Sequence, residues 1–335
     1  MGIYNSKTIR KIRKKQKVKR SFLRDLFFPT RVTVGEEEVW LETTANGNQV
    51  APIVSPIEDG RVVKEKAIST NAITAPSISP KYVLTPRDAF KRDAGDSLND
   101  GKSASLRMAT RVGKILGNQE NQITNKEELF AGQFLSEGKI TSSSGDHPYE
   151  IDYKMSNKGT LGVGETWDVN TIKALDDLDG FIVEAEKYGT KVGAVVMDGK
   201  ASSAFVNNPQ TLEYLDNRRL EAIESKQKDL APGVAYIGFY KKRSVHIYQY
   251  DRTLEENGAI KPIIPEGTIV GGPTYGEVLY APVVYFKDGG KDIHEEIRHS
   301  RVSISKNGKE KSISTESRPV FQPSDMSAYF SWKVV

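Results

Sequence analysis

The sequence contains no cysteine, only four histidines and only three tryptophans among its 335 residues. Without cysteine, disulfide bonds and thiolate chemistry are excluded, and the absence is compatible with a reducing compartment. No run reaches the roughly 18 apolar residues of a membrane-spanning helix, so we expect no membrane partner. The apolar segment FLRDLFF is interrupted by Arg24 and Asp25 and is not typical of a signal peptide. We therefore expect a protein that is made and kept inside the cell.

Motifs of catalysis and ligand binding are missing as well. A phosphate-binding loop has four residues between its first glycine and Gly-Lys-Ser, but five separate Gly95 from Gly101. In residues 159–165 the glycines fall as GxxGxG, whereas a dinucleotide fold uses GxGxxG. On a helix, His299 would point about 140° away from His294, which does not suit a zinc pair. We predict no catalytic residue, no metal site and no cofactor, and we interpret the charged segment around these histidines as solvated.

The net charge of +4 at pH 7 is unevenly distributed. Residues 7–20 contain nine Lys or Arg and no acid, which leaves 39 basic residues against 44 acidic ones, about −5, for the rest of the chain. Such a block can bind phosphates without reading base sequence. A solvated tail, or a segment that contacts an acidic neighbouring surface, explains it at least as well. The candidate contact residues for DNA or a neighbour are Arg10, Lys11, Arg13, Lys14 and Lys15.

Residues 50–86 are the least core-like stretch of the chain. Five prolines interrupt any long ladder or helix there, and the apolar residues are spread singly or in pairs. A turn at residues 58–60 separates two runs that can pair, so we predict a long two-stranded arm that needs a partner surface. The residues expected to contact a neighbouring subunit are Ile57, Glu58, Asp59, Arg61 and Val62. A disordered linker is the alternative, which the regularly placed β-branched residues and the balanced charge disfavour.

The clearest predicted element is a helix at residues 105–137, with apolar residues recurring every three or four positions. Gly138 ends it, and its glycines leave bending or interruption open. Its opposite face is polar, which favours a helix that lies across a sheet. The residues of that face are Asn118, Asn121, Asn125, Lys126 and Glu127. Before this helix we expect one strand at residues 31–42, and after it a strand at residues 148–153.

An α/β pattern begins after Trp167. We expect Asp168 to cap a first helix with apolar residues from Ile172 to Ala185, which Gly189 ends. Acids at positions 176, 177 and 179 complement its dipole without a catalytic role. A second helix is expected at residues 202–227. The predicted strands cover residues 192–197, 234–240, 245–250, 268–270, 278–286 and 326–335, with a polar hairpin at residues 301–314 around Asn307-Gly308.

A co-linear series of short motifs runs through nearly the whole chain. It consists of FLRDLFF at 22–28, VSPIEDG at 54–60, EGKIT at 137–141, GETW at 164–167, VMDGK at 196–200, LDNRR at 215–219, ENG at 256–258, IPEGTIVGG at 264–272, SRP at 317–319 and WKV at 332–334. In this order the motifs resemble the tailed-phage major capsid proteins of the lambda major head protein (protein E) family. That family has the Johnson fold, also called the Hong Kong ninety-seven type.

The resemblance implies an α+β phage major capsid fold with five parts. These are an N-terminal arm (1–35), an extended loop with flanking strands (36–90), a peripheral domain with the spine helix (91–160), an axial domain (161–288) and a hairpin with a strand that returns to the peripheral domain (289–335). It implies no catalysis, and hexamers and pentamers that close an icosahedral shell around double-stranded DNA.

The implied setting is the virion capsid, assembled in the host cytoplasm. The implied partners are other copies of the chain, portal, scaffold and decoration proteins, and packaged DNA contacted non-specifically. The basic block before Phe22 is outside the motif series, so its role stays open. Two alternatives remain at this point: an encapsulin-type compartment shell, and a DNA-binding protein that acts through its basic tail.

Overall fold

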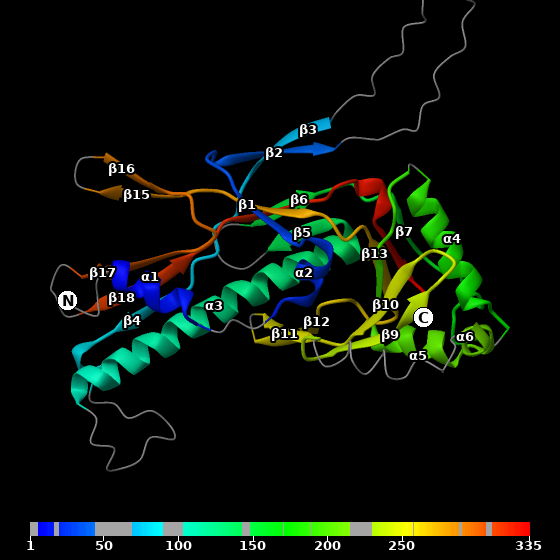
Figure 1. The fold of residues 1–335 in the computed structure, drawn as a ribbon, viewed down its shortest axis with the longest axis horizontal. Coiled ribbons are helices and arrows are strands. Elements are labelled where there is room, and N and C mark those ends of the chain that lie inside the picture. The colour runs from blue at the N-terminus through cyan, green and yellow to red at the C-terminus, as the bar shows by residue number, and fades with distance from the viewer. Residues whose placement is uncertain are drawn as a thin grey trace, which may run out of the picture.

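The computed structural model of the chain describes residues 6–16, 20–43, 69–89, 103–142, 148–169, 171–187, 189–214, 230–256, 258–287, 290–305 and 310–335. Figure 1 shows a long helix with small sheets and two short helices packed along it, and next to its C-terminal part a region of helices around a larger sheet. This mixture of helices and separate sheets is the α+β class expected from the sequence.

The elements along the long helix come mostly from the first half of the chain. They are α1 (Ser6–Lys14), α2 (Phe22–Phe27), β1 (Thr30–Thr33), β2 (Glu38–Thr43), β3 (Ser69–Thr74), β4 (Lys81–Leu84), the 3-10 helix η1 (Pro86–Ala89), α3 (Ala104–Glu137), β5 (Lys139–Ser142) and β6 (Tyr149–Asp152).

The second half contributes the larger sheet and several hairpins. Its elements are β7 (Asn157–Thr160), α4 (Ala174–Glu186), β8 (Ala194–Met197), α5 (Gly199–Asn207), α6 (Pro209–Tyr214), β9 (Val234–Tyr240), β10 (Val245–Tyr250), β11 (Thr253–Glu256), β12 (Ala259–Pro262), β13 (Thr268–Gly272), β14 (Glu277–Tyr280), β15 (Val283–Lys287), β16 (Gly290–His294), β17 (His299–Ile304), β18 (Lys311–Glu316), β19 (Pro319–Gln322), the 3-10 helix η3 (Met326–Ala328) and β20 (Phe330–Lys333).

Helix α3 confirms the predicted long helix. Its 34 residues run without interruption, about 51 Å at 1.5 Å per residue. The Ser103 side chain accepts a hydrogen bond from the Leu106 N–H at the start, and Gly138 ends the helix in the left-handed conformation with φ 68°. Gly132 does not break the helix: a Cβ at this position would lie 2.9 Å from the Ile263 carbonyl oxygen, so glycine permits a close approach of the neighbouring chain.

The prediction that Glu127 lies on the polar face of this helix is wrong, because the side chain is buried. Three further polar side chains of the helix are completely buried as well. Glu127, Glu128, Gln119 and Thr124 are completely buried, although each is polar. The periodicity argument assigns polar side chains to water, whereas here they meet buried basic and hydroxyl groups from other elements. The helix is therefore packed on more sides than its apolar stripe indicates.

Small sheets lie outside the larger one, and those that contain β5 and β18 pack on α3. They have the strand orders β1-β14-β19, β17-β18-β4, β2-β3, β5-β6, β11-β12 and β15-β16. The expected single strand at residues 31–42 is wrong, because β1 pairs with β14 and β2 pairs with β3, in two different sheets. The polar hairpin is confirmed by the β17–β18 ladder, and its expected turn at Asn307-Gly308 lies outside the described residues.

The larger sheet has the order β7-β20-β13-β8-β10-β9. Its central strands β8 and β13 are buried at every position, which explains their continuous apolar character. Helices α4 and α5 bury one apolar cluster against it; the large members are Trp167, Leu178, Ile182, Phe205 and Ile247. The expected strand at 278–286 is two strands, β14 and β15, which the Ala281-Pro282 step separates.

Two helix predictions in this region need correction. Helix α4 begins at Ala174, and Asp168 lies in the preceding turn, so Asp168 does not cap it; instead the Gln210 side chain accepts a hydrogen bond from the Leu175 N–H at 3.2 Å. The expected helix at 202–227 ends at Asn207, because Pro209 cannot continue it and begins α6. Residues 215–229 lie outside the described part of the chain.

The last strand lies in the larger sheet. β20 pairs with β13 and with β7, and β7 falls within residues 91–160, so the return of this strand to the peripheral domain stays a prediction. The apolar side chains of the segment explain its place, since Phe330 is completely buried in the cluster that contains Trp167 and Phe205, and Trp332 stacks on Phe181. The C-terminus thus joins the region that contains α4 and α5.

Candidate intersubunit site

The predicted arm at residues 50–86 is described only from residue 69 on. Residues 69–74 form β3, which pairs with β2 outside the predicted range, and residues 81–84 form β4, which pairs with β18, so the expected extent of the arm to residue 86 is wrong.

We call the β2–β3 ladder the arm base. The strands pair antiparallel, with Glu38 opposite Thr74 and Thr43 opposite Ser69. Val39 points into the main core and is 4% exposed, whereas Trp40 on the other face is 54% exposed. Alternation along a half-buried strand explains this difference, but an indole left in water is unusual for a packed strand. The predicted contact residues Ile57, Glu58, Asp59, Arg61 and Val62 lie outside the described residues.

Arg318 fixes this base to the body of the protein. Its guanidinium donates to the carbonyl oxygens of Ala75, at 3.2 Å, and Pro282, at 3.0 Å, and to a carboxylate oxygen of Glu37, at 3.1 Å. Glu37 precedes β2 and Ala75 follows β3, so one side chain binds both roots of the arm. A planar guanidinium can satisfy several acceptors in fixed directions, which the ammonium of lysine cannot.

A carboxylate of α3 organises the N-terminal turn of α2. Glu128 is completely buried and accepts five hydrogen bonds, from the backbone N–H groups of Phe22, Leu23 and Arg24 and from the hydroxyls of Ser21 and Tyr250. The first N–H groups of a helix have no partner within it, and a negative charge at this end is favourable. Burial, with the nearby Glu128 charge, raises the pKa of Tyr250 far above its usual range, so its hydroxyl is a donor.

A second carboxylate, Glu127, lies between two buried arginines. It accepts a hydrogen bond from Arg298 at 2.9 Å and another from Arg24. Arg298 also donates to Glu120 and to the Thr124 hydroxyl. Burial opposes the charge on Arg24, but Glu127 and Asp25 outweigh it and raise the Arg24 pKa. The network joins α2, α3 and the turn before β17, which are far apart in the sequence.

Helix α1 shows where the basic block lies. Ile9 is completely buried, in a cluster with Met108, Val112 and Ile313 among others. Arg10 pairs with Glu296 at 3.6 Å, and Arg13 pairs with Glu120 at 3.5 Å. Burial lowers the pKa of Arg13, against the attraction of these acids.

The five predicted cations therefore divide into two groups. Arg10 and Arg13 contact the body of their own chain, as the previous pairs show. Lys11, Lys14 and Lys15 are exposed. A cavity of about 610 Å³ borders this region, lined by six cationic and four acidic side chains of α1, α2, β1, α3 and residues 295–298. This mixture of cationic and acidic side chains is expected where the buried ion-pair network reaches the surface.

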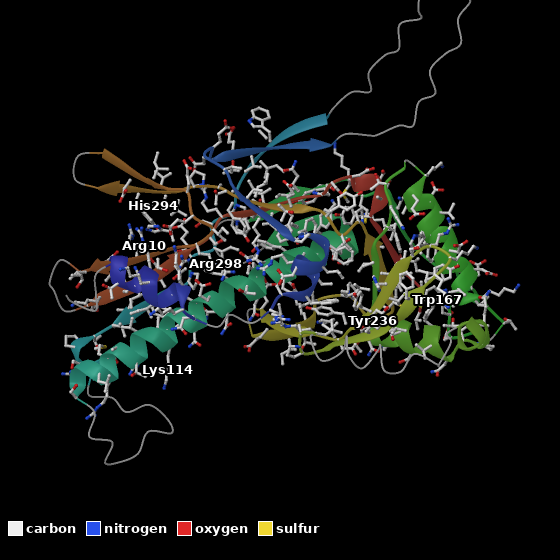
Figure 2. All side chains as sticks on the ribbon, viewed as in Figure 1. Arg10, Lys114, Trp167, Tyr236, His294 and Arg298 are labelled. Carbon is white, nitrogen blue, oxygen red and sulfur yellow. The ribbon has the colours of Figure 1, made fainter. Side chains whose placement is uncertain are left out.

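The interpretation of residues 294–299 as solvated is wrong for Arg298 and His299. These side chains are 8% and 2% exposed. The rings of His294 and His299 stack, with centroids 3.8 Å apart and planes at 15°. In the described parts of the chain no group of three or more His, Cys, Asp or Glu side chains could hold a metal ion. Figure 2 shows His294, Arg10 and Arg298 at the same end of the molecule.

Sequence reasoning missed Arg298, Arg318 and the buried carboxylates. One signal was available: Glu120, Thr124, Glu127 and Glu128 recur at the three and four spacing of the apolar stripe, which places them on its face. Their basic partners lie more than a hundred residues away, and no local pattern pairs them. No helix in the described ranges is long and apolar enough to cross a membrane.

Solved structures share this architecture over its full length. The crystal structure of a capsid protein assigned to a prophage of Escherichia coli CFT073 superposes with a TM-score of 0.70 at 18% identity, covering 100% of both chains. A phage-related protein of Bordetella bronchiseptica RB50 superposes with a TM-score of 0.53 at 12% identity, covering 97% of this chain and 95% of its own. The fold is therefore that of a phage capsid subunit of the Hong Kong ninety-seven type.

The sequence comparisons identify the family. The profile described as "Phage major capsid protein E" matches residues 7–334. The chain belongs to this family, and it is a structural protein of the virion capsid. It is 29% identical over 266 residues to the major capsid protein of Escherichia phage lambda, covering 77% of this chain and 76% of that one. It is 26% identical over 288 residues to the major capsid protein of Escherichia phage N15, covering 83% of both. These relatives make the encapsulin alternative the weaker one.

Proposed function

We propose that copies of this capsid protein assemble into hexamers and pentamers that close an icosahedral shell around double-stranded DNA. The observation that carries the proposal is the arm base: a two-stranded ladder fixed by Arg318 exposes Trp40 to solvent. An exposed large aromatic on a rigid element is typical of an interface residue. The occupant of that surface is an adjacent copy, because a shell repeats one subunit.

The remaining assignments follow from this proposal. The arm contacts its neighbour through Ile57, Glu58, Asp59, Arg61 and Val62. The subunit performs no catalysis, is assembled in the host cytoplasm, and meets portal, scaffold and decoration proteins there. Its five parts are those expected from the family resemblance, with the same bounds.

Replacing Trp40 tests the proposal. In Trp40→Ala, we expect folded subunits with a nearly unchanged unfolding midpoint, since the side chain is 54% exposed. The yield of shells, measured by sedimentation and electron microscopy, falls at least tenfold, about 1.4 kcal/mol per contact, because each subunit loses an aromatic anchor. Ile57→Asp gives the same phenotype if the distal arm also lies on the neighbour.

Tyr275→Ala is the matched control. Tyr275 is 53% exposed and lies in the segment between β13 and β14, outside the β2–β3 ladder. It should change neither stability nor shell yield. A wild-type shell yield for both Trp40→Ala and Ile57→Asp contradicts the role of the arm. A purified wild-type chain that stays a 37.2 kDa monomer in every assembly condition, with phage partners present, contradicts shell formation itself.

A non-specific DNA contact is supported by a separate observation. Lys11, Lys14 and Lys15 are exposed on one short segment, whereas Arg10 and Arg13 contact the chain's own acids. Changing these three lysines to Gln should leave assembly intact and weaken DNA binding to purified subunits. The slope of log affinity against log salt should fall by about 0.9 for each lost phosphate contact, up to roughly 3. An unchanged slope would show that these lysines do not contact DNA phosphates and instead face solvent or another protein.

A further inference from the structure

The contacts of α1 with the rest of the chain are few and specific. The helix has nine residues, too short to be stable alone in water. Among residues 8–14 of the helix, whose burial is described, Ile9 is completely buried. Ile12 is partly buried against the same apolar cluster. The polar contacts are those of Arg10 and Arg13, which reach Glu296, Glu120 and His299. The charges of these polar groups therefore affect how strongly α1 is bound to the rest of the chain.

The hydrogen bond between Arg10 and His299 fixes the protonation of the ring. Arg10 Nη2 lies 3.3 Å from His299 Nε2. A guanidinium has only donors, so Nε2 must be the acceptor and cannot carry a proton. The proton of the neutral ring then sits on Nδ1, which lies 3.9 Å from a Glu296 oxygen and makes no hydrogen bond in the described structure. A second proton on this ring would turn the contact with Arg10 into repulsion.

The groups around His299 come from every element that packs there. They are Arg10 and Arg13 of α1, Tyr285 of β15, Asp292 and His294 of β16, Glu296 of the following turn, Arg301 of β17 and Glu316 of β18. Burial is the main cause that lowers the His299 pKa to about 3, and His294, Arg10 and Arg13 add to it against Asp292. The His294 ring stacks on that of His299 with the centroids 3.8 Å apart, so water cannot solvate a charged His299 on that face.

We propose that the stacked rings of His294 and His299 form an acid-sensitive seat for α1, which binds the helix while His299 is neutral and releases it when His299 gains a proton. Figure 2 places Arg10 on α1 next to His294. Release also frees Arg10 and Arg13, so the basic segment that the closed form partly neutralises becomes available as a whole. The seat thus links proton concentration to the exposure of the N-terminal cations.

The direction of the pH effect follows from linkage. With α1 in place the His299 pKa is about 3, and in a released, solvated state it returns toward the ordinary 6.5. The binding of α1 is therefore at full strength above about pH 6.5 and weakens as the pH falls toward 3, by up to tenfold per unit. Between pH 7.5 and 5.0 the expected loss in the docking equilibrium is on the order of tenfold or more.

Hydrogen exchange of the full-length chain tests the proposal. The protection of amides in residues 6–16 is measured by mass spectrometry at pH 7.5 and 5.0, after correction for the intrinsic pH dependence of exchange. Peptides from α3 serve as the internal reference. We expect α1 protection to fall about tenfold or more at pH 5.0 while α3 protection is unchanged.

Three variants test whether His299 and its contact with Arg10 cause the pH dependence of α1 protection. His299→Gln keeps an acceptor for Arg10 but cannot be protonated, so α1 stays protected at both pH values. Arg10→Gln can donate to a neutral ring or accept from a charged one, so it reduces the pH dependence while burial still lowers the His299 pKa, and it does not depend on the folding of the first variant. His246→Gln changes a histidine of β10 that bonds Tyr236, outside the seat, and keeps the wild-type response.

Three outcomes overturn the proposal. The first is unchanged α1 protection in the wild-type chain between the two pH values. The second is a wild-type loss of protection in both His299→Gln and Arg10→Gln. The third is a parallel loss in α3, which would show global unfolding in place of release of α1.

Discussion

The junction of α2 with α3 and the core under α4 and α5 are stabilised by different means. At the junction, the completely buried Glu127 and Glu128 meet Arg24 and a helix N-terminus. In the other core, the buried side chains are apolar, with Phe205 and Ile182 completely buried beside Trp167. One region is joined by directed polar contacts and the other by shape and apolar area.

The two regions tolerate substitutions differently. A buried charge that loses its partner costs several kcal/mol, because neither water nor another group replaces the contact. An apolar core accepts a smaller apolar side chain at lower cost, since neighbours partly close the cavity. The junction of α2 with α3 is therefore fixed in one geometry, whereas the α4 and α5 core is defined mainly by volume.

Glu128→Ala is the variant that should separate the two regions most strongly. It leaves three backbone N–H groups and two hydroxyls without their acceptor, so we expect a loss of about 3–5 kcal/mol in the free energy of unfolding. Glu128→Gln keeps one acceptor oxygen and should lose less, about 1–3 kcal/mol. Denaturant titration of the unassembled subunit measures both.

Glu184→Ala provides the control for this prediction. Glu184 lies on α4, pairs with Lys187 at 3.1 Å and is 60% exposed. Its loss should change the unfolding free energy by less than about 0.5 kcal/mol. If Glu128→Ala is as mild as Glu184→Ala, the junction is not stabilised by its buried carboxylate and the contrast between the two regions fails.

The sequence predicts elements with a regular apolar period better than elements whose ends depend on single residues. Elements defined by local periodicity, such as α3 with its stop at Gly138, appear near their expected bounds. The start of α4 was predicted wrongly because the hydrogen-bond acceptor at its N-terminus is Gln210, which is distant in sequence, and not Asp168. The breaks at Pro209 and Pro282 were not predicted, although proline interrupts a helix or a strand. The family resemblance supplied the assembly context that periodicity alone does not contain.

The buried network was out of reach because its partners are distant in sequence. Arg298 meets Glu127 across 171 residues, and Arg318 meets Glu37 across 281. Local composition assigns such residues to solvent, and for residues 294–299 it did so wrongly. The spacing of Glu120, Thr124 and Glu127 on the apolar stripe was the one local sign that polar groups would be buried there.

A smaller change in unfolding free energy is expected for substitutions in the apolar core under α4 and α5. Phe205 is completely buried and its ring lies 5.5 Å from the Trp167 ring. Phe205→Leu removes part of this contact, so we expect a loss of about 1–2 kcal/mol in unfolding free energy. Neither side chain titrates between pH 5 and 8, so the loss should be the same at both values. Phe239→Leu, on a ring that is 38% exposed on β9, should cost less than about 0.5 kcal/mol. A Phe205→Leu loss that grows with acidity would mean that this core also depends on charged groups, and the two regions would then differ in degree only.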